Sequence, residues 1–282
     1  MSNDEILKIS KSIQIVVTYI SEDRLNWIKK QLEDLNILLD VHYLKGFTPV
    51  DSTDYIIEKH EKLGHFEVDA QICCTRSFAS AINWFVKNCS EKKYLVTMED
   101  DVCFLKFGFV NKLIEATKAL SIISNHVDFV SLGYLPSITD IDFKSLNQFP
   151  NQGPIHYDLW KSRNIGYESI FWGNQMTLFT IEKAREVAEV IHQKNTTIFR
   201  SQISKRIDDG HFYSDRNPVL ITDHFMPIVF RQSLVYPPLA IEGDFYSLMQ
   251  HGQNNLRYVN HDWSSILDIS NYHIYPTREE SK

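Results

Sequence analysis

Three consecutive carboxylates, Glu99, Asp100 and Asp101, are the residues of this sequence whose types and spacing most directly suggest chemistry. They follow an apolar run at residues 94–98 that is typical of a strand covered on both faces. Adjacent anions at the end of such a strand repel one another, so they need either a cation among them or full solvation. Two interpretations are therefore open: a metal site, and a solvated acidic turn that caps the next helix.

A divalent metal is the cation that such a site would take. Mn²⁺ and Mg²⁺ are hard cations that bind carboxylate and phosphate oxygens, and they act as Lewis acids. Alternate residues leaving a strand point to the same side, so Glu99 and Asp101 are expected to share a face while Asp100 points away. By this geometry Glu99 and Asp101 are assigned to the metal, although a turn that begins at Asp100 would change the set.

The elements that would position these carboxylates alternate along the chain. A strand at 13–20, a helix from Ser21 as its N-cap, and a strand at 40–45 predict a β-α-β unit. This order predicts an α/β fold with a parallel sheet, in which ligands bind beyond the carboxyl ends of the strands. Further helices are predicted at 69–88, 105–121 and 181–194 (capped by Thr180), further strands at 94–98, 127–132 and 171–179, and a long loop region at 133–169.

Length and composition limit the classes of protein that fit. The 282 residues, 43% of them hydrophobic, predict one domain over 1–282, with a regular α/β half at about 10–135 and a loop-rich half at about 136–282. A net charge of -7 without a basic run argues against nucleic-acid binding. No export signal or membrane span is recognisable, so a soluble, cytoplasmic protein is expected. The four cysteines are interpreted as free thiols, most of them buried.

Six segments, in the same order along the chain, resemble glycosyltransferase family 25. The clearest is YLVTMEDDVCF, which resembles the family's hydrophobic strand followed by Glu-Asp-Asp. The family's Gly-Cys-x-x-Ser-His helix start is similar to CCTRSFASAINWF, where Cys74 and Ser77 match but Cys73 and Phe78 do not. The other four are the opening strand and helix with Arg24, the strand from Gly173 to Thr180, ITDHF with Asp223, and QSLVYPPLAIEGD.

The resemblance implies a GT-A fold, an α/β domain with a mixed, mostly parallel sheet. It also implies a metal-dependent glycosyltransferase that moves a hexose from a UDP-sugar to a saccharide or protein hydroxyl, with inversion and with Mn²⁺ or Mg²⁺ bound. The family's Ala-Val-Asp-Gly is replaced here by Lys45-Gly46-Phe47-Thr48, which indicates a divergent member whose donor sugar differs.

The resemblance also distributes roles among further residues. Asp223 is assigned as the base that takes the acceptor proton, with Glu242 behind it, although Asp223 could instead be a helix N-cap. His251 is assigned as a third metal ligand, the alternative being an exposed loop histidine. The donor site is assigned to Tyr19, Arg24, Ser77, Asp100 and Asn174.

Two other functions stay open from the sequence. The departures from the family pattern allow a catalytically silent protein that binds a nucleotide sugar or a glycan on the same fold. A metal-dependent nucleotidyltransferase or phosphohydrolase also uses acidic strand ends, but the sequence contains no Gly-rich phosphate loop. The donor sugar, the acceptor and the oligomeric state are not specified by the sequence.

Overall fold

The first β-branched run forms strand β1 (Ile13–Tyr19), which opens a β-α-β unit. Ser21 caps the following helix, α2 (Glu22–Asp34), because its hydroxyl accepts a hydrogen bond of 3.3 Å from the Arg24 amide. The chain then forms β2 (Asp40–Lys45), which pairs with β1 in parallel. The β-α-β unit and its cap are thus confirmed.

The remaining elements complete an α/β chain. In this computed structural model, residues 2–35, 39–52, 69–136, 155–158, 171–192, 226, 230–243 and 268–273 are described. The other helices are α1 (Asn3–Ser12), η1 (Val50–Ser52), α4 (Asp69–Asn88), α5 (Phe109–Ile123), α7 (Ile181–His192) and η5 (Ile269–Asn271). The other strands are β3 (Tyr94–Glu99), β4 (Val102–Phe104), β5 (Phe129–Pro136), β6 (Ile155–Asp158), β7 (Phe171–Thr180), β8 (Gln232–Val235) and β9 (Ala240–Glu242).

The described strands form one curled, mixed sheet in the order β2-β1-β3-β7-β5-β8-β6, with β9 pairing to β5 and to β4. The prediction of a mixed sheet is confirmed, and most of the described strands run in the same direction as β1 and β3. β7 runs against both of its neighbours, β3 and β5, and β4 and β6 are also reversed. An apolar run identifies a buried strand without fixing its direction, which depends on the connections.

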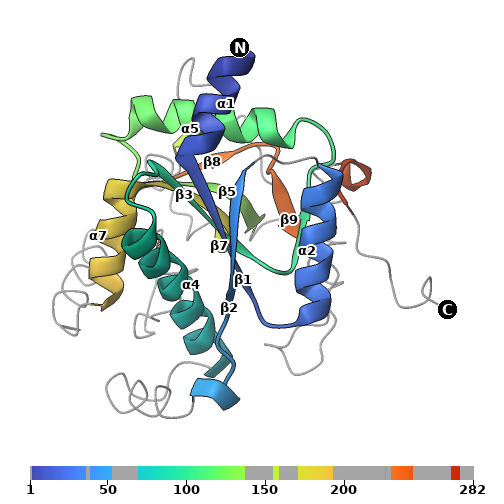
Figure 1. Cartoon of the computed structure of the whole chain (residues 1–282), viewed down its shortest axis with the longest axis vertical. Coiled ribbons are helices and arrows are strands. Elements are labelled where there is room, and N and C mark those ends of the chain that lie inside the picture. The colour runs from blue at the N-terminus through green and yellow to red at the C-terminus, as the bar shows by residue number, and fades with distance from the viewer. Residues whose placement is uncertain are drawn as a thin grey trace.

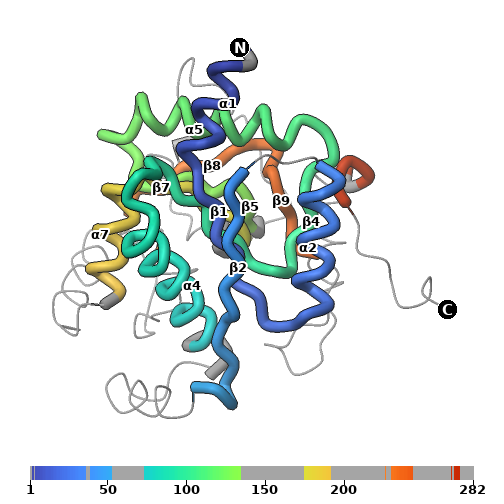
Figure 2. The backbone as a smooth tube through the Cα atoms, in the orientation of Figure 1, coloured from blue at the N-terminus to red at the C-terminus, as the bar shows by residue number. Residues whose placement is uncertain are grey.

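Helices cover both faces of the sheet (Figure 1). α4 and α7 pack on one face, where Phe85 and Ala184 meet Leu95 of β3. α2 and α5 pack on the other face, where Ile28 and Phe109 belong to a larger buried cluster. The backbone trace shows α4 and α7 together on one side of the strands and α2 apart from them (Figure 2). Leu95 and its neighbour Val96 reach opposite layers because successive strand residues alternate in direction.

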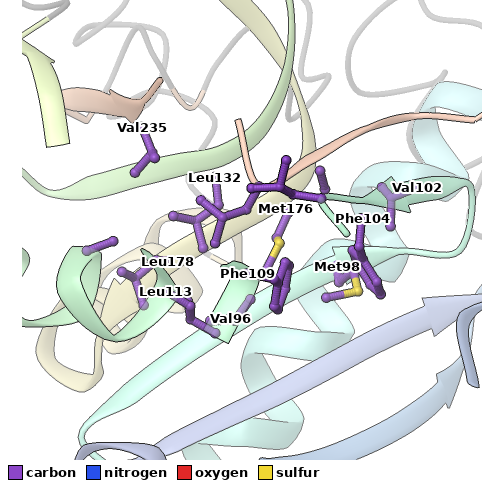
Figure 3. Close-up of a cluster of buried hydrophobic side chains, with 14 of the residues drawn as sticks. Val96, Met98, Val102, Phe104, Phe109, Leu113, Leu132, Met176, Leu178 and Val235 are labelled. Carbon is purple, nitrogen blue, oxygen red and sulfur yellow. The ribbon is translucent and has the colours of Figure 1, made fainter. Parts of the chain in front are cut away.

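The larger cluster holds the acidic strand in place. Val96 and Met98 of β3 lie beside Met176 of β7 and Phe109 of α5 in this cluster (Figure 3). All four side chains are almost completely removed from water. Burial of this kind contributes roughly 1.5–3 kcal/mol for each large apolar side chain. The strand that carries the three carboxylates is therefore a rigid part of the core.

Several elements differ from the sequence prediction. The helix predicted from residue 105 begins at Phe109, because Leu105 forms a β-bridge with Tyr272 and Gly108, at φ 77°, is the N-cap. α1, β6, β8 and β9 were not predicted, and β6 lies within the region predicted as a long loop. The four cysteines are free, three of them buried, as predicted. Among the described residues, no helix has both the length and the apolar character needed to span a membrane.

Candidate active site

Helix α2 brings two polar side chains to the acidic end of β3. Its buried face carries Trp27, Ile28 and Leu32, and Arg24 and Gln31 fall on the same face at helical spacing. Gln31 donates to the Val102 carbonyl at 2.9 Å, and its side-chain oxygen accepts from the Phe104 amide at 2.7 Å. β4 is thereby fixed to α2 immediately after the carboxylates.

Asp100 is held by contacts within the protein. Its Oδ1 lies 3.2 Å from Nη1 of Arg24, and its Oδ2 accepts a hydrogen bond of 2.8 Å from the Ile20 amide. Both side chains are buried. Arg24 and Asp100, which were assigned to the donor site, thus bind each other and join the turn after β1 to the end of β3.

Asp101 is the carboxylate that remains available. Its Oδ2 lies 3.7 Å from the same Arg24 nitrogen, whereas its buried Oδ1 has no hydrogen-bond partner among the described residues. Its side chain is 19% exposed, which distinguishes it from Asp100 at 6%. The Asp101 carbonyl accepts a hydrogen bond of 2.6 Å from the Gly243 amide. Asp101 therefore has a fixed backbone and a buried carboxylate oxygen that makes no hydrogen bond to another described residue.

Asp100 and Asp101 both lie close to the same positive charge, the guanidinium of Arg24. Burial raises the pKa of Asp100 to about 6, the negative charge of Asp101 adds to the shift, and the Arg24 guanidinium opposes it. Burial also raises the pKa of Asp101, again against the effect of Arg24. Both shifts mean that the charged carboxylates are under-stabilised as they stand. A second cation at Asp101 would lower both pKa values.

Glu242 joins this site from the C-terminal part of the chain. It ends β9, which pairs antiparallel with β4 so that Glu242 lies opposite Val102, the residue after Asp101. Glu242 is 9% exposed. Glu99 ends β3 in register with Thr18 of β1, one residue before Tyr19. The structure therefore brings the described site residues to the carboxyl ends of β1 and β3, the edge that the sequence predicted.

Ser77, on α4, lies beside the turn that follows β2. Its hydroxyl accepts from the Phe47 amide at 2.8 Å and donates to the Cys73 carbonyl at 2.9 Å. The Gly46 amide donates to the Tyr19 carbonyl at 2.7 Å, so the same turn is also attached to β1. Through these contacts, Ser77 holds the turn after β2 against α4.

Replacing Ser77 with alanine should loosen this turn. The substitution leaves the Phe47 amide without its acceptor, and losing a hydrogen bond of this kind costs about 1–3 kcal/mol. We expect faster hydrogen exchange at the Phe47 amide together with a lower free energy of unfolding. Ser121→Ala, at an exposed helix position, is the matched control and should change neither measurement. Unchanged exchange in Ser77→Ala would contradict this role.

Comparisons with known proteins identify no family. Neither a protein-family model nor a curated protein matches the chain. Among solved structures, the chain is similar to A197 from STIV at 12% identity and a TM-score of 0.37, covering 81% of this chain and 82% of that one. It is also similar to a glycosyltransferase involved in the glycosylation of the major capsid of PBCV-1, at 9% identity and a TM-score of 0.32, covering 82% and 91%. With TM-scores this low, neither match decides the function.

Three of the assigned residues lie beyond this description. Asp223 and His251 fall outside the described residues, as does the side chain of Asn174. Within the described part of the chain, no three His, Cys, Asp or Glu side chains are grouped so that they could hold a metal ion. The sequence analysis missed Gln31 and the Ile20 amide. Gln31 could have been found, because it is a polar residue on the apolar face of α2.

Proposed function

We propose that the chain is a metal-dependent glycosyltransferase of GT-A fold that transfers a hexose from a UDP-sugar to a hydroxyl of a saccharide or protein. The observation that supports this most is the position of Asp101. Its buried Oδ1 makes no hydrogen bond to another residue in the described part of the chain, and it follows the carboxyl end of β3, next in the chain to the residue that Glu242 faces. Ligands of α/β sheets bind beyond this end of the strands. The acidic segment also carries the resemblance to glycosyltransferase family 25.

The residues present fit a divalent cation. Mg²⁺ is usually held by one or two carboxylates, with substrate phosphates and water completing its coordination, so a cage of three protein ligands is not required. Asp101 would supply a carboxylate oxygen, while Glu99, and His251 from outside the described residues, stay further candidate ligands. When bound, Mn²⁺ or Mg²⁺ would neutralise the diphosphate as it leaves.

The proposed reaction is a single displacement with inversion. The acceptor oxygen forms a bond to the anomeric carbon as the bond from that carbon to the diphosphate oxygen breaks, and UDP departs with the bonding electrons. The acceptor proton passes to a carboxylate. Glu242 is the described candidate for this base, and Asp223 stays the other candidate. Arg24 lies close to both Asp100 and Asp101, so it would hold Asp101 in position.

Isothermal titration calorimetry and an assay of UDP release test the proposal. Full-length protein should bind UDP or a UDP-sugar in the presence of Mn²⁺, and binding should be lost when EDTA removes the metal. A panel of UDP-hexoses with and without simple glycoside acceptors should give acceptor-dependent release of UDP. Metal-dependent binding without any turnover would favour a silent nucleotide-sugar-binding protein, and no binding of any UDP-sugar would refute both functions.

A further inference from the structure

A hollow lies where the connection between β4 and α5 meets the segment 268–272. It encloses about 270 Å³. Its lining includes Phe107, Lys112, Pro237, Asp268, Asn271 and Tyr272. None of these residues takes part in the proposed transfer reaction. The hollow is therefore a separate feature of the molecule that needs its own explanation.

Hydrogen bonds between distant parts of the chain form the walls of this hollow. The Lys106 amide donates to the Asn271 carbonyl and the His273 amide to the Phe104 carbonyl, each at 2.8 Å. The buried Tyr272 hydroxyl donates to the Pro238 carbonyl at 2.7 Å. These bonds attach the C-terminal segment to β4 and to the turn before β9. The hollow is thus preformed, as binding sites for small molecules usually are.

The lining combines an aromatic surface with polar groups of both charges. Phe107 is 78% exposed. Lys112 offers hydrogen-bond donors, Asp268 offers acceptors, and the Asn271 amide offers both. A pyranose ring has the matching chemistry, with an apolar C–H face and a border of hydroxyls. The charges of Lys112 and Asp268 offset each other in the lining, which suits a neutral ligand.

The size of the hollow points to the same class of ligand. Pockets for drug-sized molecules have volumes of roughly 300–1,000 Å³, so the hollow accommodates a small ring rather than a whole nucleotide sugar. β4 joins the two regions: Leu105 also lines the hollow and follows Asp101 by four residues. Extended residues rise about 3.3 Å each, so the backbone positions of Asp101 and Leu105 are at most about 13 Å apart.

We infer that this hollow is a saccharide-binding site that takes one neutral sugar ring, with the ring stacked on Phe107 and its hydroxyls bound by Lys112, Asp268 and Asn271. The site binds its saccharide without a metal or a nucleotide, so it is independent of the proposed transfer reaction. If the transfer reaction also holds, the site retains a saccharide at the end of β4 that lies away from the acidic residues.

Fluorine NMR of the full chain tests this inference. The protein is labelled with 4-fluorophenylalanine, and the signal that disappears in Phe107→Leu is assigned to Phe107. Methyl glycosides of glucose, galactose, mannose and N-acetylglucosamine are titrated in the presence of EDTA. At least one should shift the Phe107 signal in a saturable manner, and Asn271→Ala should weaken that binding at least tenfold.

Control variants separate this result from the proposed transferase activity. Two variants should retain the saccharide-dependent shift: Ile122→Ala, at an exposed apolar position of α5, and Asp101→Asn. Absence of a saturable shift with all four glycosides would overturn the inference. A shift produced by inorganic phosphate alone would also overturn it, because the site would then bind anions.

Discussion

Asp101→Asn should abolish metal-dependent binding of UDP-sugars and lower any transferase activity by roughly 10²- to 10³-fold, the effect of removing a group that stabilises transition-state charge. The amide keeps the shape of the side chain but removes the negative charge that would hold a divalent cation. The buried Oδ1 of Asp101 makes no hydrogen bond to another described residue, so the substitution removes none between that oxygen and such a residue. Calorimetry with Mn²⁺ and UDP measures the loss.

The fold of this variant should be intact. Burial raises the pKa of Asp101, so the charged carboxylate is unfavourable in the folded state and its removal should leave the melting temperature equal or higher. Asp23→Asn, which replaces an exposed carboxylate beside Arg24 in sequence, is the matched control and should bind UDP-sugars as the natural chain does. Unchanged metal-dependent affinity in Asp101→Asn would refute the assignment of Asp101.

Arg24→Gln should have the largest effect on stability. The substitution removes the guanidinium that lies 3.2 Å from Asp100 and 3.7 Å from Asp101 and leaves two adjacent carboxylates without their cation. Breaking a buried ion pair by removing one partner costs about 3–5 kcal/mol. Urea denaturation measures this loss. The measurement is made at pH 7.5 or above, about a unit above the reference pKa of histidine, so that histidine side chains are mostly neutral. Lys30→Gln, an exposed position on the same helix, should be close to neutral.

The cost of Arg24→Gln should depend on pH. The pKa of Asp100 is already raised to about 6 in the natural chain, and loss of Arg24 removes a group that lowers it. A carboxyl whose folded pKa exceeds its unfolded value contributes stability that is fully present below the unfolded pKa and is lost as pH rises through the folded pKa. The variant is therefore expected to lose more stability than the natural chain as pH rises from about 4 to above 6.

A double variant separates charge from packing in this prediction. Arg24→Gln combined with Asp100→Asn removes one of the two carboxylates, so it should recover part of the stability that Arg24→Gln loses, with a weaker dependence on pH. A loss that is equal at acidic and neutral pH, and that the second substitution does not relieve, would mean that Arg24 stabilises the fold through packing alone.

The parts of the fold that the sequence predicts are those with strong local signals. β1, α2 and α4 combine long apolar patterns with recognisable ends, such as the Ser21 cap, and they lie where the patterns indicate. β4 and β9 have three residues each, too few to produce a period, and neither was predicted as a strand. The reversed direction of β7 was also not predicted, because it depends on long-range connections.

The candidate site, like the fold, could be predicted from the sequence only in part. The acidic residues were recognisable because three adjacent carboxylates after a buried strand are costly without a cation. Their individual roles were not, since the pairing of Asp100 with Arg24 depends on the angle at which α2 crosses the end of β3. Alternation along the strand separated Asp100 from its neighbours, but it could not reveal that the Ile20 amide would also bind it.

The two hydrogen bonds of Gln31 have a consequence for motion. They join the middle of α2 to both ends of β4, while Arg24 joins the first turn of α2 to the acidic residues. The Phe104 amide proton can therefore exchange with solvent only when the helix separates from the strand. We infer that α2, the acidic residues and β4 open as one cooperative unit.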